Sequence, residues 1–242
     1  MLNFVSEHRL ASGKQLVRQF WRTSNRDAAA ARAGRRALKR LAAWRILDPL
    51  PNRTIGGVHG GSNTLIYGVG VTGARLLAKR GLVQKRLATP GDRYVKHTLA
   101  ATELVVGLHE ADREGVLELI QVQPEPACWR AFLGSGAVRM IVKPDLFVRV
   151  GAGSISEDRW QIEVDLATEA RMTIRLKAQR HLAYYRSARE TVHPRVLWAV
   201  PDQRRAEQIT EALRHLPAPA QRLFAVCLLD EVVEFLAQEA RS

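Results

Sequence analysis

Two neighbouring stretches decide how this chain folds: IVKPDLFVRV at residues 141–150 and RWQIEVDLATEA at residues 159–170. Each places acidic residues among β-branched and aromatic ones, a composition typical of strands in a buried sheet. Side chains alternate between the two faces of a strand, so Glu163 and Asp165 are expected to point to the same side. A hairpin loop centred near Ser154 would place Asp145 opposite Glu163 on that face.

Three converging carboxylates repel one another unless a cation lies among them. Their oxygens are hard ligands, which favour Mg²⁺ or Mn²⁺ over zinc. The sequence therefore predicts a magnesium or manganese site at Asp145, Glu163 and Asp165, and neutralising one of them is expected to leave folding intact or to improve it. The alternative is structural ion pairing of these acids with nearby basic residues, namely Lys143, Arg149 or Arg171.

The spacing of apolar residues around these strands predicts a mixed α/β domain with a central sheet flanked by helices. The expected helices cover residues 98–111, 170–190, 203–215 and 229–239. The expected strands cover residues 116–123, 138–149, 159–166, 195–200 and 222–227.

The first part of the chain differs from the rest in charge. Residues 1–96 contain 19 Lys or Arg and four acids, a net charge of +15, whereas residues 97–242 have a net charge of −2. A strongly basic region is typical of proteins that bind nucleic acid, because each phosphate that a cation neutralises releases condensed counterions. We therefore expect two domains, residues 1–95 and residues 96–242, of which the first binds DNA.

The order of elements in the basic part suggests how it binds. Residues 12–22 and 26–46 are expected to be helices, the second ending before Asp48, Pro49 and Pro51, and the Gly-rich stretch up to residue 69 is expected to be a two-stranded ribbon. A helix over residues 71–80 follows. This order is typical of a winged helix, whose second helix enters the major groove. The residues expected to contact DNA are basic: Arg26, Arg32, Arg35, Arg36, Lys39, Arg40 and Arg53. A solvated basic helix that merely packs on the other domain is the alternative.

The acidic motifs also carry a family resemblance. Pro144-Asp145 followed by Glu163-Val164-Asp165 resembles the PD-(D/E)xK signature of restriction-endonuclease-like nucleases, with Asp165 where that signature has lysine. The layout over residues 10–200 resembles the replication-relaxation family of bacterial plasmids and mobile elements, which is similar to a group of conjugative relaxases. The resemblance implies a restriction-endonuclease-like α/β/α sandwich with a mixed central sheet. Lys177, on the following helix, could replace the signature lysine, with Arg175 and Gln179 as competitors and an ordinary surface lysine as the alternative. Glu103, on the helix before the sheet, could be a fourth acid; an exposed helix glutamate without a role is the alternative there.

We therefore expect a metal-dependent DNA endonuclease or nickase with Asp145, Glu163, Asp165 and Lys177 as its catalytic residues. The second hypothesis is a non-enzymatic DNA-binding regulator of replication or transcription with a degenerate nuclease fold. An RNA-binding protein is weaker, because the basic residues are not interleaved with aromatic ones. The expected partners are duplex DNA, with single-stranded DNA at the cleavage site, and a second copy or other proteins of a mobile element.

The sequence also predicts a cytoplasmic protein without membrane contact. It contains no run of eighteen apolar residues, and its first 21 residues carry five charged or histidine side chains. Cys128 and Cys227 lie far apart and belong to no CxxC motif, so neither a disulfide framework nor a zinc site is expected.

Overall fold

The computed structural model describes residues 1–21, 28–55, 64–82, 90–151, 157–187 and 192–241. The chain forms two compact units, Met1–Arg113 and Glu114–Ser242. The expected boundary at residue 95 is therefore displaced, because the long helix α5 (Asp92–Arg113) packs with the first unit. No helix among the described residues is both long enough and apolar enough to cross a membrane.

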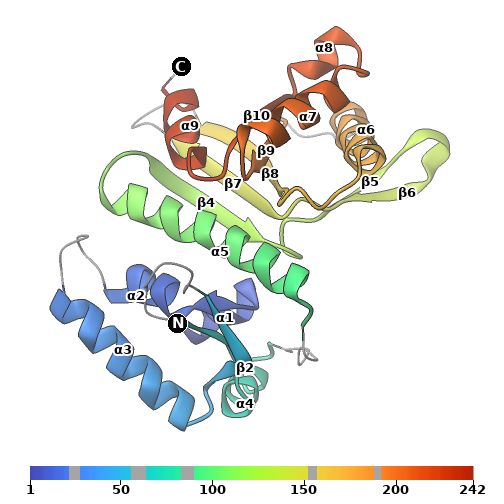
Figure 1. Ribbon diagram of the computed structural model, residues 1–242. Helices are drawn as coiled ribbons and strands as arrows, with labels where there is room; N and C mark the ends of the chain where they lie inside the picture. The colour runs from blue at the N-terminus through green and yellow to red at the C-terminus, as the bar shows by residue number, and fades with distance from the viewer. Residues whose placement is uncertain (22–27, 56–63, 83–89, 152–156, 188–191, 242) are drawn as a thin grey trace. The chain divides into compact units, whose positions relative to one another are not determined.

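The first unit combines helices with a small antiparallel sheet in the order β1-β3-β2 (Figure 1). Ala11 of β1 pairs with Tyr67, and Leu47 of β2 pairs with Val69, so β3 is the central strand. Besides α5, its elements are α1 (Leu2–His8), β1 (Ala11–Ser12), α2 (Gly13–Trp21), α3 (Ala28–Ala43), β2 (Leu47–Ile55), β3 (Thr64–Val69) and α4 (Val71–Ala78).

Helix α3 is the basic helix expected over residues 26–46, but it ends earlier. Arg45 has a φ of 56°, a left-handed conformation that cannot continue a helix. Asp48 and Pro49 therefore lie in strand β2, at the edge of the sheet, where a proline is tolerated because no neighbouring strand needs its missing N–H. The β2–β3 pair confirms the expected two-stranded ribbon.

The second unit is built on a five-stranded mixed sheet in the order β10-β9-β8-β7-β4. The pairs β10–β9 and β9–β8 are parallel, whereas β8–β7 and β7–β4 are antiparallel. The strands are β4 (Glu118–Pro124), β7 (Leu146–Gly151), β8 (Glu157–Val164), β9 (Arg195–Val200) and β10 (Phe224–Leu228). The helices are α6 (Arg171–Ser187), α7 (Gln203–Leu213), α8 (Ala218–Gln221) and α9 (Val232–Glu239). The mixed central sheet is confirmed.

Helices cover both faces of this sheet. On one face, Trp198 of β9 packs in a buried cluster with Ile174 of α6 and Ile209 of α7. On the other face, the ring of Trp160 on β8 lies 5.4 Å from that of Phe235 on α9. Successive residues of β8 point to opposite faces, so Gln161 and Glu163 point towards α6 while Trp160 points towards α9.

The expected strand over residues 138–149 is interrupted. It consists of β6 (Arg139–Val142) and β7, with Lys143, Pro144 and Asp145 between them. Proline has no N–H to donate to a neighbouring strand, so the ladder breaks there. Strand β6 pairs instead with β5 (Arg130–Leu133), a strand not expected from the sequence, and the two form a separate hairpin joined by a short 3₁₀ turn, Ser135–Ala137.

The expected register between the two acidic stretches is confirmed. Leu146 pairs with Ile162 in the antiparallel β7–β8 pair, and the Asp145 amide donates to the carbonyl oxygen of Ile162 at 3.0 Å. Continuing this register by one residue places Asp145 opposite Glu163. Ser154, the expected centre of the hairpin, lies outside the described residues.

Candidate carboxylate and lysine site

Glu163 is the centre of the candidate site and is 2% exposed. Its Oε2 accepts a hydrogen bond from Nζ of Lys177 at 2.9 Å, and its Oε1 lies 2.7 Å from Nε2 of His181. Lys177 and His181 are four residues apart on α6, so both side chains lie on the same face of that helix. The expected approach of Lys177 to the acidic strand is therefore what the structure shows.

The charged states of Glu163 and Lys177 depend on each other. Burial alone would raise the pKa of the Glu163 carboxyl, but the Lys177 ammonium and the hydrogen bond to His181 hold it below its usual value. Burial would lower the pKa of Lys177, whereas Glu163 and Glu169 together raise it above its usual value. Nζ of Lys177 lies 2.8 Å from Oε1 of Glu169, so one ammonium joins two carboxylates. Both Glu163 and Lys177 are therefore held in their charged forms.

His181 is 2% exposed and lies between two acceptors, because its Nδ1 is 2.9 Å from Oε1 of Gln161. In that arrangement both ring nitrogens donate and the imidazole carries a charge. The Nε2 group of Gln161 is buried and has no partner among the described residues. Rotating this amide by 180° would let Nε2 donate to Nδ1 and would leave His181 neutral while it still donates to Glu163. In both arrangements, His181 fixes the orientation of the Glu163 carboxylate.

Asp165 has a different partner from the one expected. Arg205 of α7 donates to both of its oxygens, from Nε at 3.2 Å and from Nη2 at 2.8 Å, and the Ala167 amide donates to Oδ1 at 2.6 Å. Arg205 also donates from Nη2 to the backbone oxygen of Glu169 at 2.7 Å. The Asp165 and Arg205 side chains are 1% and 9% exposed, so they form a buried ion pair that ties β8 to α7.

Asp145 lies beside Glu163 at the start of β7. Its Oδ2 accepts a hydrogen bond from the Val164 amide at 2.7 Å, which fixes the carboxylate against β8. Among the described residues, no three His, Cys, Asp or Glu side chains lie close enough together to hold a metal ion. The expected convergence of all three acids around one ion is therefore absent from the described geometry, because Asp165 is turned towards Arg205.

Glu169 and the basic side chain of Arg205 complete the described surroundings of the site. Oε2 of Glu169 is buried and has no hydrogen-bond partner among the described residues. The described ion pairs bring two fixed cations, Lys177 and Arg205, to Glu163, Asp165 and Glu169. Asp145 is the fourth carboxylate of the region.

The other predicted residues lie in the first unit. Glu103 of α5 accepts hydrogen bonds from Arg18 and from Gln15 of α2, so it joins two helices of that unit. Its expected role as a fourth acid stays a prediction. The expected DNA contacts on α3 are all exposed: Arg32, Arg35, Arg36, Lys39 and Arg40. Arg26 and the side chain of Arg53 lie outside the described residues.

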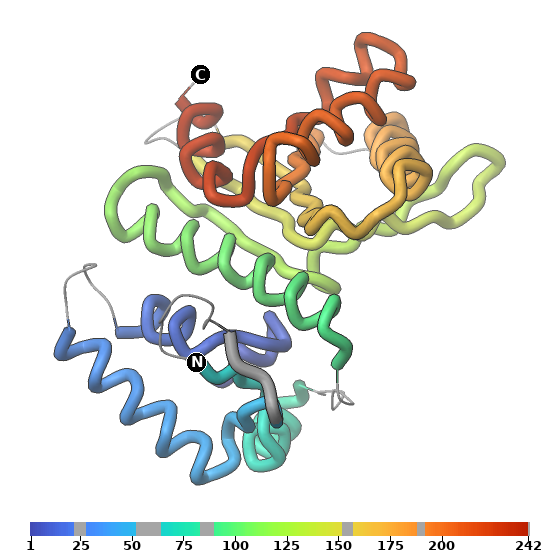
Figure 2. The backbone as a smooth tube through the Cα atoms, viewed as in Figure 1, coloured from blue at the N-terminus to red at the C-terminus, as the bar shows by residue number. Residues whose placement is uncertain are grey.

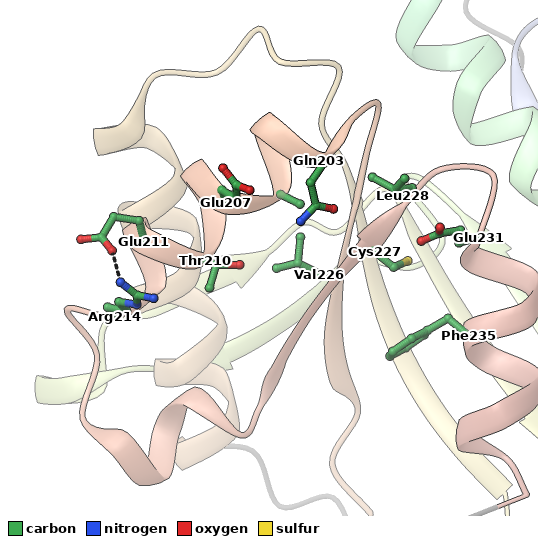
Figure 3. A pocket seen from close by; sticks show the side chains of 11 residues that line it. Gln203, Glu207, Thr210, Glu211, Arg214, Val226, Cys227, Leu228, Glu231 and Phe235 are labelled. Carbon is green, nitrogen blue, oxygen red and sulfur yellow. Dashed lines mark hydrogen bonds and ion pairs between the residues drawn. The ribbon is translucent and has the colours of Figure 1, made fainter.

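A separate groove of about 640 Å³ lies between α7, β10 and α9 (Figure 3). Its walls combine apolar residues such as Val226 and Phe235 with the exposed acids Glu207 and Glu211. Glu211 forms an ion pair with Arg214 at 2.6 Å. The groove is lined by none of the predicted catalytic residues.

Comparison with known proteins identifies the family of the chain. The model of the replication-relaxation family matches residues 2–196, which include Asp145, Glu163 and Lys177. The chain belongs to the replication-relaxation family. No match was found among curated proteins or among solved structures. The replication-relaxation match ends within β9, so it includes the acidic strands and α6 but not α7, which contributes Arg205.

Sequence reasoning missed four residues of this site: Gln161, Glu169, His181 and Arg205. Two of them had a signal, because Gln161 shares the alternation of Glu163 and Asp165, and His181 follows Lys177 by one helical turn. Arg205 had none, since it lies 40 residues from Asp165 on a helix predicted only from its apolar spacing.

Proposed function

We propose that this member of the replication-relaxation family binds duplex DNA through its first unit and cleaves a phosphodiester bond at Asp145, Glu163 and Lys177. The family description indicates a role in DNA replication or relaxation on a plasmid or mobile element. The observation that carries the catalytic proposal is the buried contact between Glu163 and Lys177 beside Asp145. It is the carboxylate, carboxylate and lysine set of the PD-(D/E)xK signature, with the lysine supplied by α6.

The residues fit a divalent cation at two carboxylates rather than three. Asp145 and Glu163 offer hard oxygen ligands, the class that Mg²⁺ and Mn²⁺ prefer. A bound Mg²⁺ or Mn²⁺ would polarise the scissile phosphate and lower the pKa of an attacking water. Lys177 would hold a phosphate oxygen by its ammonium, and His181 would keep the Glu163 carboxylate in place. In this proposal Asp165 has a structural role, because its ion pair with Arg205 holds β8 against α7.

DNA binding is proposed for the first unit on its topology and charge. The order α1-β1-α2-α3-β2-β3, with β3 central in the sheet, is the order of a winged helix. In this proposal α3 is the recognition helix, because it exposes five basic side chains while it buries Ala31, Gly34 and Leu38. Phosphate contacts would supply affinity, and base contacts from the same helix would supply specificity.

The catalytic proposal is tested by incubating the full chain with supercoiled and single-stranded DNA in Mg²⁺, Mn²⁺ or EDTA. We expect cleavage with a divalent ion and a loss of at least about a hundredfold in Glu163→Gln and in Lys177→Met. The matched controls are Glu207→Gln and Arg180→Met, which make the same changes at exposed positions on α7 and α6 and should retain activity. Equal losses in the variants and their controls would refute the site.

A second function is favoured by one observation. Both oxygens of Glu163 and both oxygens of Asp165 already accept hydrogen bonds from protein groups. This pairing suits a non-enzymatic DNA-binding regulator. In such a protein, the carboxylates of a formerly catalytic strand are occupied by ion pairs and bind no metal. The regulator would bind DNA with equal affinity in the parent and in Glu163→Gln, and would cleave no DNA in any divalent ion.

Helix α3 is tested separately, by changing Arg35, Arg36, Lys39 and Arg40 together to glutamine in the full chain. Each lost phosphate contact should reduce the slope of log K against log salt by about 0.9. Unchanged affinity and slope would mean that this helix does not face DNA, whatever the activity of the second unit.

A further inference from the structure

The β5–β6 hairpin and the residues beside it carry basic but no acidic side chains. Residues 126–143 contain three Lys or Arg and no Asp or Glu, whereas the second unit as a whole has no net charge. Figures 1 and 2 show the hairpin extending away from the five-stranded sheet of this unit. The rest of the unit, residues 114–125 and 144–242, contains 14 Lys or Arg and 17 Asp or Glu. A cationic ribbon attached to a body of net negative charge indicates an anionic partner for the ribbon itself.

The two faces of the hairpin differ. Phe132 packs its ring 5.5 Å from that of Tyr184 on α6, and Val142 belongs to the same cluster, so this face is covered. Leu133 pairs with Arg139 on the opposite face. Leu133 is 62% exposed, and Val138 at the turn is 60% exposed.

The base of the hairpin is fixed to strands β4 and β7, next to the candidate site in the sequence. Arg130 donates to Oε1 of Gln123 at 2.7 Å, and its guanidinium lies 5.1 Å from the centre of the Phe147 ring on β7. The exposed Lys143 lies 4.5 Å from the centre of the Trp129 ring and precedes Asp145 by two residues. A strand of DNA held at Lys143 would therefore be close to the proposed catalytic carboxylates.

We propose that the β5–β6 hairpin is an arm that grips duplex DNA, with Arg139 and Lys143 on phosphates and the apolar tip directed into a groove. The proposal rests on the proposed function, because it gives the second unit a contact with the same substrate. Paired strands lie about 4.8 Å apart, so a two-stranded ribbon with its side chains is narrow enough to enter a major groove about 12 Å wide. The absence of acids from residues 126–143 favours DNA over a protein surface of mixed charge.

The test compares two double variants of the full chain by their salt dependence of binding to a DNA duplex. Arg139→Gln with Lys143→Gln should reduce the slope of log K against log salt by about 1.8, since two phosphate contacts are lost. Arg204→Gln with Arg222→Gln makes the same change in net charge at exposed positions outside the hairpin, and should reduce it by less than about 0.5. All four positions are exposed, so both variants should fold.

The outcomes separate this proposal from the catalytic one. A reduced slope in the hairpin variant supports the arm even if the parent cleaves no DNA. Equal slopes in the two variants overturn the arm while DNA binding by α3 and cleavage at Glu163 still stand. A change in self-association, measured by sedimentation, without a change in slope would overturn it in favour of a protein interface. A parent that binds no DNA at any salt concentration refutes both proposals.

Discussion

Replacing Arg205 by methionine tests whether Asp165 is a structural strut or a catalytic acid. The two side chains are 9% and 1% exposed and share two hydrogen bonds, so the replacement leaves a buried carboxylate with the Ala167 amide as its described donor. Breaking a buried ion pair by removing one partner typically costs about 3–5 kcal/mol. That is a large part of the roughly 5–15 kcal/mol by which domains are stable.

Asp165→Asn should cost less, about 2 kcal/mol, because the asparagine oxygen can still accept from Ala167 while Arg205 keeps the backbone oxygen of Glu169 as a partner. The double variant removes both charges. Its destabilisation should therefore fall short of the sum of the single effects by at least about 2 kcal/mol. Such a cost would contradict the expectation from sequence that neutralising Asp165 leaves folding intact or improves it.

The assay is urea unfolding at pH 7, followed by tryptophan fluorescence and by circular dichroism, with the free energy of unfolding obtained by linear extrapolation. Cleavage of DNA by Asp165→Asn is measured in parallel at a temperature at which the variant is folded. A cost below about 1 kcal/mol for Arg205→Met would refute the structural role of the ion pair. The same conclusion would follow if the double variant lost the sum of the two single effects. Loss of cleavage in Asp165→Asn at unchanged stability would restore Asp165 as a metal ligand.

Two further predictions concern the first unit. Burial, with a smaller contribution from His109, lowers the pKa of His8 to about 4, so the neutral form stabilises the fold above pH 6.5 and about 3 kcal/mol of that stability is lost as the pH falls to 4. His8→Phe should flatten this part of the pH profile of unfolding, and an unchanged profile would contradict the reasoning. A methyl group on Gly70 would overlap the Arg45 carbonyl oxygen, so Gly70→Ala should cost at least about 2 kcal/mol. Gly91→Ala meets no atom within 4 Å and should change thermal stability by less than about 0.5 kcal/mol.

Much of the local structure could be read from the sequence. Strand β9 was predicted with its observed bounds, and the β7–β8 register followed from the acids and the polar loop between them. Both depend on neighbours along the chain, because the alternation of side chains fixes which residues share a face. The break at Pro144 also had a local cause, but the stretch was read as one strand because its apolar residues are nearly continuous.

The division into two units could not be read in the same way. The change in charge occurs near residue 96, but α5 packs with the first unit through contacts such as that of Gln15 with the Leu99 backbone oxygen at 2.8 Å. A helix with apolar residues on several sides can be buried against either neighbour, and its own sequence does not say which.

In the candidate site, too, the sequence determined some features and the tertiary structure decided others. The sequence determined that Asp145, Glu163 and Asp165 would share one face of adjacent strands, and the position of Lys177 one turn before His181 determined that these two would share a face of α6. Only the tertiary structure decided how each carboxylate is neutralised. Glu163 meets Lys177 and His181 because α6 packs on that face, and Asp165 meets Arg205 because α7 does. A charge in a buried position takes its partner from whatever element is packed against it, and that choice is made in three dimensions.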